Sequence, residues 1–244
     1  MNQRPTLPPG HRSLLLGLFL AWLAIAGCLG ISPHNRVDWW LEHIVVVVGL
    51  AILVITGRWF VFSKPAYLLG FAFLCLHEIG AHHTYSEVPY RDWLPDWLDG
   101  AGRVASGAED RNHFDRLVHF LYGLLLARPW REAYYFAMKP RRDGWSHLVV
   151  VSFAMSTSLL YELLEWAAAI LYGGEDGMAF LGVQGDIWDA HKDMLLATAG
   201  AVVASVAMTL RRVLTGRDPA REWGTGPGDY RREPDLPPTF DRGA

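Results

Sequence analysis

The residues best suited to chemistry in this chain are carboxylates and imidazoles at helical spacing beside long apolar runs. They form four pairs, three with spacing i,i+4 and one with spacing i,i+3: Glu78/His82, Asp115/His119, Asp189/Asp193 and Glu162/Glu165. Residues at these spacings share one face of a helix, so each pair would present two polar groups to the same neighbour. Ionisable groups are disfavoured in hydrocarbon, so such pairs indicate a function.

Three kinds of chemistry fit these residue types. Imidazole nitrogens and carboxylate oxygens could bind a divalent metal, as Glu and Glu-x-x-His pairs do inside helix bundles. The candidate metal ligands are His77, His82, His119 and Asp193. Crowding could instead keep one carboxyl protonated and create a general acid–base pair. The candidate catalytic residues are Glu78, Asp115, Glu162, Glu165 and Asp189. In the third case, Arg116 and Lys192 neutralise the acids in a structural network.

The apolar runs that must position these groups are close to twenty residues long, the length of a membrane-spanning helix. With 51% hydrophobic residues in 244, the chain is predicted to be an all-α, polytopic membrane bundle of about six transmembrane helices. The expected spans are 13–31, 39–56, 62–83, 113–128, 146–172 and 188–212. The fourth is short, and a basic loop over 128–145 is expected to follow it.

The expected membrane domain, 13–212, lies between two tails. Residues 1–12 are basic and Pro-rich, and 213–244 are rich in Pro, Gly and charge, so both are predicted to be disordered. The first apolar run could also be a signal peptide, and Ile25-Ala26-Gly27-Cys28 is similar to a lipoprotein cleavage box. The apolar run continues past Cys28, which favours a first transmembrane helix.

The distribution of basic residues predicts the orientation. The 128–145 loop carries as many Lys and Arg residues as all the loops on the opposite side together. Because these residues collect in cytoplasmic loops, both termini are predicted to be cytoplasmic. The third span then runs outward and places Glu78 roughly 20 Å beyond Lys64. The polar pairs of the other spans fall at the same level, in a pocket that faces the periplasmic side.

The composition of the chain limits the classes of partner and of metal site that it can have. A net charge of −3 and the lack of a basic stripe argue against nucleic acid, and membrane lipids are the expected surroundings. Cys28 and Cys75 both lie in apolar runs, and their spacing predicts neither a disulfide nor a metal site. His77-Glu78 and His82-His83 do not form the metalloprotease motif His-Glu-x-x-His, because the spacing is one residue too long.

Four long motifs, at 77–90, 112–125, 161–166 and 184–194, resemble the bacterial inner-membrane YjdF family over about 40–210. The resemblance implies a multi-spanning membrane protein and leaves its activity open. A weaker resemblance, over about 112–200, is to VanZ-like membrane proteins. It includes Asp115 to Phe120, with Glu165 in place of a Gln and Asp193 in place of an Asn.

Three functions follow as hypotheses. The first is a membrane-embedded site for a metal or for the head group of an envelope lipid, with hydrolytic chemistry. The second is a small transporter or proton-coupled carrier, although the inner halves of the spans look uniformly apolar. The third is a non-catalytic scaffold whose polar cluster locks the helices together.

Overall fold

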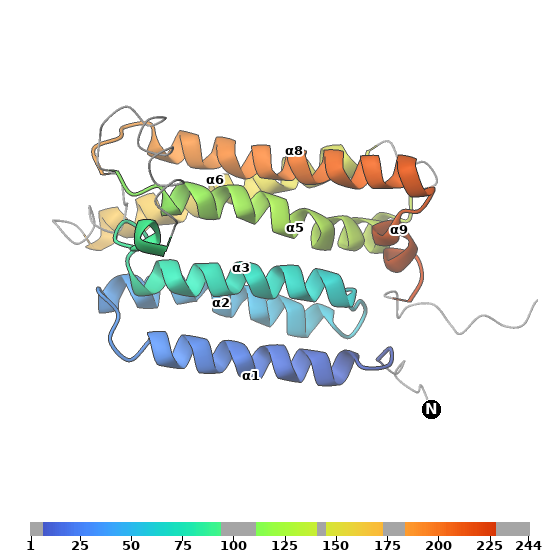
Figure 1. Cartoon of the computed structure of the whole chain (residues 1–244), viewed down its shortest axis with the longest axis horizontal. Helices are drawn as coiled ribbons and strands as arrows, with labels where there is room; N and C mark the ends of the chain where they lie inside the picture. Colours follow the sequence, from blue (N-terminus) through green and yellow to red (C-terminus); the bar gives the residue numbers. More distant parts are fainter. Residues whose placement is uncertain (1–6, 94–110, 141–144, 173–183, 228–244) are drawn as a thin grey trace, which may run out of the picture.

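The computed structural model describes residues 7–93, 111–140, 145–172 and 184–227. These residues form only helices, so the predicted all-α fold is confirmed for them. The elements are α1 (His11–Leu29), α2 (Arg36–Thr56), α3 (Lys64–His82), η1 (Tyr90–Trp93), α5 (Phe114–Met138), α6 (Ser146–Tyr172), α8 (Asp189–Thr215) and α9 (Pro219–Gly224). The long helices run side by side along one axis, with α3 and α5 between the others (Figure 1).

The helix ends follow from local chemistry. Asn35 begins α2, because its side chain accepts hydrogen bonds from the first free backbone N–H groups, those of Val37 and Asp38. Ser63 caps α3 in the same way. Gly216 ends α8 with a φ of 68°, a left-handed conformation that costs glycine little.

Within the residues that the structure describes, four helices are long and apolar enough to cross a membrane: α1, α2, the segment Ser146–Leu171 of α6, and α8. Their outer faces carry exposed large hydrophobic residues such as Val54 and Leu171, as expected of surfaces that face lipid. Helices α3 and α5 lie parallel to these four (Figure 1). The 19 residues of α3 reach about 28 Å, close to the thickness of a hydrocarbon core. The total of six spans stays a prediction.

Helix α5 is longer than expected. It continues through Pro129 to Met138, so the first part of the expected 128–145 loop is helical. Arg131 is only 1% exposed and forms hydrogen bonds of 2.7 and 2.6 Å to the two carboxylate oxygens of Asp218. The positive charge of Arg131, which was expected in a loop, is thus neutralised inside the bundle.

Part of the tail expected to be disordered is also helical. Asp218 caps α9, which packs on α5, and Nε1 of Trp223 donates a hydrogen bond of 2.7 Å to the carbonyl of Val61. His11, in the other expected tail, begins α1 and stacks on Trp223 with ring centroids 5.3 Å apart. The start of α1 and helix α9 therefore lie at the same end of the bundle. Residues 1–6 and 228–244 lie outside the described residues.

Helices α5 and α8 approach each other at two glycines. A Cβ on Gly123 would overlap the backbone carbonyl of Ala197, and one on Gly200 would overlap that of Phe120. Ala197 itself is fully buried. The close approach at Gly123, Ala197 and Gly200 brings the polar faces of α5 and α8 together.

Candidate metal centre and polar network

Glu78 is the centre of a polar group shared by the first three helices. Its carboxylate is fully buried and accepts a hydrogen bond of 2.7 Å from Nε1 of Trp22 on α1. Nε2 of His43 on α2 lies 3.2 Å from its other oxygen. The second nitrogen of His43 lies 2.6 Å from the carbonyl oxygen of Trp39, which can only accept, so this nitrogen carries a proton.

A second group joins α2, α3 and α6. The hydroxyl of Tyr161 donates a hydrogen bond of 2.7 Å to Glu42, and Nε2 of His77 lies 3.9 Å from the same carboxylate oxygen. Nδ1 of His77 hydrogen-bonds to the hydroxyl of Tyr85 at 2.7 Å. A Cβ on Gly80 would overlap the Tyr85 ring, so the glycine makes room for this contact. His77 is thus held on one side and faces Glu42 on the other.

A third group joins α5, α6 and α8. Asp115, His119 and Asp193 each offer one donor atom, and these atoms lie within 4.8 Å of one another. Nε2 of His119 lies 3.6 Å from Asp115 and 3.5 Å from Oε1 of Glu162. The predicted sharing of helix faces is therefore realised: the pair on α5 meets one acid of each neighbouring helix.

Two carboxylate oxygens of the third group have unused hydrogen-bonding capacity. Oε1 of Glu162 and Oδ1 of Asp193 are buried, and no described residue donates a hydrogen bond to them. Buried polar atoms nearly always have a partner, because leaving one unpaired costs free energy. The structure thus leaves two buried carboxylate oxygens without a hydrogen-bond donor near the imidazole of His119.

Asp189 has a different environment. It pairs with Arg111 and lies 3.4 Å from Arg116, which also pairs with Asp186. The ammonium of Lys192, the backbone N–H of Trp188 and Arg116 hold the pKa of Asp186 well below its usual range. The predicted neutralisation by Arg116 and Lys192 thus occurs at Asp186 and Asp189, at the end of the bundle. Asp189, a candidate catalytic residue, is ion-paired.

The structure separates His82 from Glu78, although both residues contact α1. Nδ1 of His82 hydrogen-bonds to the carbonyl of Leu29 at 2.8 Å, and its neighbours are His34 and His83. Glu165 is half-buried and lies one turn after Glu162 on α6. Of the nine candidate site residues, Asp115, His119, Glu162, Glu165 and Asp193 therefore belong together, whereas His77 and Glu78 lie in the neighbouring groups.

Sequence reasoning assigned no role to three contributors. Trp22 and Tyr161 lie in apolar runs, and Tyr85 follows α3 in a turn with a φ of 54°. An indole N–H or a phenol inside a span is itself a signal, because its polar atom needs a partner when buried.

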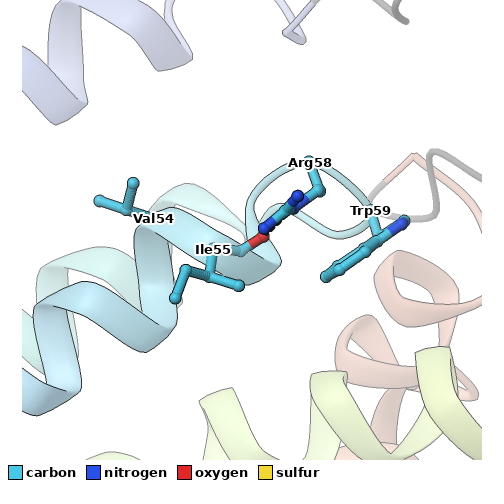
Figure 2. Close-up of a pocket in the computed structure, with 4 residues that line it drawn as sticks. All are labelled: Val54, Ile55, Arg58 and Trp59. Carbon is cyan, nitrogen blue, oxygen red and sulfur yellow. Dashed lines mark hydrogen bonds between the residues drawn. The ribbon is translucent and has the colours of Figure 1, made fainter.

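A surface pocket at the end of α2 is lined by Val54, Ile55, Arg58 and Trp59 (Figure 2). The guanidinium of Arg58 lies 4.5 Å from the centroid of the Trp59 ring. Val54 is about 18 Å along the helix from Glu42. The pocket therefore lies away from the three polar groups.

Comparisons with known proteins agree with the fold. A family model described as "Predicted membrane protein (DUF2238)" matches residues 14–213. The inner membrane protein YjdF of Escherichia coli (strain K12) is 33% identical over 178 residues, which cover 72% of this chain and 80% of that protein. No solved structure matches the chain significantly. The predicted YjdF-type resemblance is confirmed, whereas the weaker VanZ-like resemblance stays a prediction.

Proposed function

The chain belongs to the DUF2238 family of predicted membrane proteins, and from this premise we propose that it binds a divalent metal ion inside its helix bundle. The ligands are Asp115 and His119 of α5, Asp193 of α8 and Glu162 of α6. The observation that carries the proposal is the placement of two unpaired, buried carboxylate oxygens beside one imidazole.

The donor set favours a first-row transition metal. One imidazole and three carboxylates suit Zn²⁺, Mn²⁺ or Fe²⁺, and carboxylate-rich sites of this kind occur in bundle cores. Metal–ligand bonds of about 2.0–2.2 Å place neighbouring donors roughly 3.3 Å apart. The donor atoms of Asp115, His119 and Asp193 lie within 4.8 Å of one another, and Oε1 of Glu162 lies 3.5 Å from Nε2 of His119, so small side-chain rotations would reach that separation. The metal would also offset the repulsion between three neighbouring acids, of which Asp193 is buried and Asp115 and Glu162 are half-buried.

The chemistry proposed for this site is hydrolysis at the polar head group of an envelope lipid. A bound ion would supply a Lewis acid. The neighbouring group provides proton transfer, because Nε2 of His77 is buried, has no hydrogen-bond partner among the described residues and faces Glu42. The Tyr161 hydroxyl, bonded to Glu42, fixes this carboxylate in place. Helices with lipid-facing outer surfaces surround both groups, which suits a lipid substrate.

The site is proposed to open to the periplasmic side of a bacterial inner membrane. The relative from Escherichia coli is an inner membrane protein, and in the sequence the basic residues Lys139, Arg141 and Arg142 follow the end of α5, whereas Asp115 lies at its start. With those basic residues in the cytoplasm, Asp115 and Asp193 fall in the outer half of the membrane.

Elemental analysis of detergent-purified protein tests the metal site. The affinity tag must contain no histidine. We expect stoichiometric Zn, Mn or Fe in the native protein and its loss in Asp193→Asn and His119→Ala. His191→Ala, which removes an exposed imidazole of α8, is the control and should keep the metal.

Three results of that analysis separate the alternatives. Folded native protein without metal after growth in metal-supplemented medium would overturn the proposal. Metal that persists in Asp193→Asn would place it elsewhere. If Asp193→Asn and His119→Ala both fail to fold in the presence and absence of metal, the polar groups act as a structural network.

A further inference from the structure

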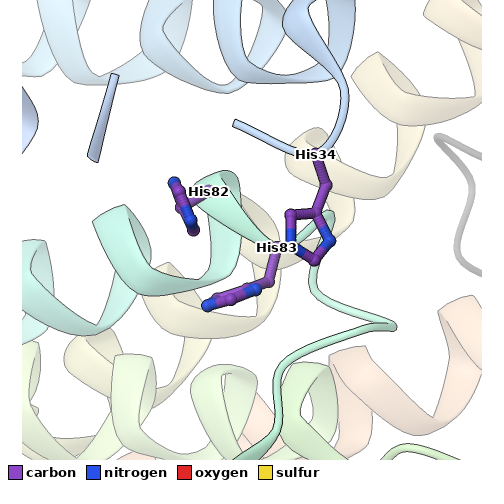
Figure 3. A group of neighbouring side chains, drawn as sticks. All are labelled: His34, His82 and His83. Atoms are coloured by element: carbon purple, nitrogen blue, oxygen red, sulfur yellow. The ribbon is translucent and has the colours of Figure 1, made fainter. Parts of the chain in front are cut away.

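We propose that His34, His82 and His83 form a second metal site, at the polar end of the bundle, for a cation that prefers imidazole ligands. One nitrogen from each ring lies within 4.8 Å of the others. Figure 3 shows the three rings gathered where the α1–α2 connection meets the end of α3. Ring centroids are 4.5 Å apart for His82 and His83, and 4.6 Å apart for His34 and His83.

The backbone holds these three residues together. His82 is the last residue of α3 and His83 is its cap, so their positions follow from the helix. The backbone N–H of His34 donates a hydrogen bond of 2.9 Å to the carbonyl of His82. Two segments about fifty residues apart in sequence are thus joined at the cluster itself, which reduces the entropic cost of assembling three ligands.

Hydrogen bonds to the far nitrogens of two rings orient them as metal ligation requires. Nδ1 of His34 lies 2.9 Å from a carboxylate oxygen of Glu87, and Nδ1 of His82 lies 2.8 Å from the carbonyl oxygen of Leu29. Both acceptors lack a proton, so each Nδ1 carries one and each Nε2 keeps its lone pair. A carboxylate or carbonyl partner on the far nitrogen is typical of histidines that bind metals.

The third ring supplies an independent observation. Nδ1 of His83 is buried and has no hydrogen-bond partner among the residues that the structure describes. A buried ring nitrogen without a partner is costly, and a cation shared with His34 and His82 would satisfy it. The cluster therefore contains one ring nitrogen without a partner, in His83, next to the two oriented rings of His34 and His82.

The donor type distinguishes this site from the one proposed inside the bundle. Three neutral imidazoles suit Zn²⁺, Cu²⁺ or Ni²⁺, whereas the inner site has one imidazole among carboxylates. With three protein ligands, tetrahedral zinc keeps a fourth position for water or a substrate. The side chain of His34 is 41% exposed, so that position is accessible from solvent.

Zinc titration of tag-free, chelator-stripped protein in detergent tests this site. A chromophoric chelator competes for Zn²⁺, and the variants are His34→Ala, His83→Ala and the control His191→Ala. We expect at least a tenfold loss of affinity in His34→Ala and His83→Ala and no change in His191→Ala. Glu87→Gln should weaken binding about tenfold, because it removes the carboxylate that hydrogen-bonds to Nδ1 of His34 but no metal ligand.

Two measurements on the Asp193→Asn variant keep the two metal sites distinguishable. Asp193→Asn should leave this zinc affinity unchanged, since its carboxylate belongs to the inner site. Cu²⁺ added to Asp193→Asn should give nitrogen hyperfine structure in its electron paramagnetic resonance spectrum, and His34→Ala should reduce it. The proposal would be overturned if His34→Ala and His83→Ala had the zinc affinity and the electron paramagnetic resonance spectrum of the native protein. This outcome does not depend on whether the inner site binds metal.

Discussion

Arg131 and Asp218 form a bidentate ion pair that joins the C-terminal third of α5 to the N-cap of α9. Arg131 is 1% exposed and Asp218 is 8% exposed, and the guanidinium also donates hydrogen bonds to Ser146 and Tyr135. Because α9 contacts α5 and stacks on His11 of α1, this pair holds one end of the bundle closed.

Breaking this pair should destabilise the protein strongly. Arg131→Met leaves the Asp218 carboxylate buried without its partner, which typically costs about 3–5 kcal/mol. Arg217→Met is the matched control, because its pair with Glu222 is 72% and 45% exposed and is worth at most about 1 kcal/mol. Unfolding in mixed micelles measures both. Equal stability of the two variants would contradict the structural role of the buried pair.

Substitution of Gly200 tests the packing of α5 against α8. Gly200→Ala places a methyl group against the carbonyl of Phe120, and overpacking of this kind costs about 1–3 kcal/mol. Gly49→Ala on α2, where no atom lies within 4 Å of the added carbon, should be neutral or slightly stabilising. Thermal unfolding in detergent compares the two. A Gly200→Ala protein as stable as native would show that the helices do not pack this closely.

The stabilisation that Asp186 provides should depend on pH. Its pKa in the folded protein is lowered, chiefly by Lys192, so the carboxylate stabilises the fold above its unfolded pKa of about 4. This contribution is lost as the pH falls through the folded value. The melting temperature of native protein should exceed that of Asp186→Asn at pH 7, and the difference should shrink below about pH 4. A difference that stays constant between pH 7 and pH 3 would contradict this assignment.

Labelling with a membrane-impermeant maleimide tests the predicted orientation. The background is a chain in which Cys28 and Cys75 are replaced by serine. Asp92→Cys, in the exposed η1 turn, should react in intact cells. Arg217→Cys, near the end of the chain, should react only after the cells are permeabilised. The reverse pattern would invert the orientation and place the polar groups toward the cytoplasm.

Much of the fold could be predicted because apolar length and helical spacing are local properties. The runs that became α1, α2, α6 and α8 meet the length and composition of membrane helices. The end of α5 could not be predicted this way. Arg131 and Glu132 look like loop residues until Asp218 and Ser63, both distant in sequence, are seen to pair with them inside the bundle.

The sequence by itself determined which polar residues share a helix face, since the spacing of Asp115 and His119 or of Asp189 and Asp193 settles that. Only the tertiary structure decided their partners. Asp193 lies beside His119, whereas Asp189 pairs with Arg111. The imidazole of His82 lies beside His34 and is separated from Glu78. The physical reason is that the partner of each polar side chain depends on the distances between helices and on the geometry of the turns. A local sequence pattern encodes neither.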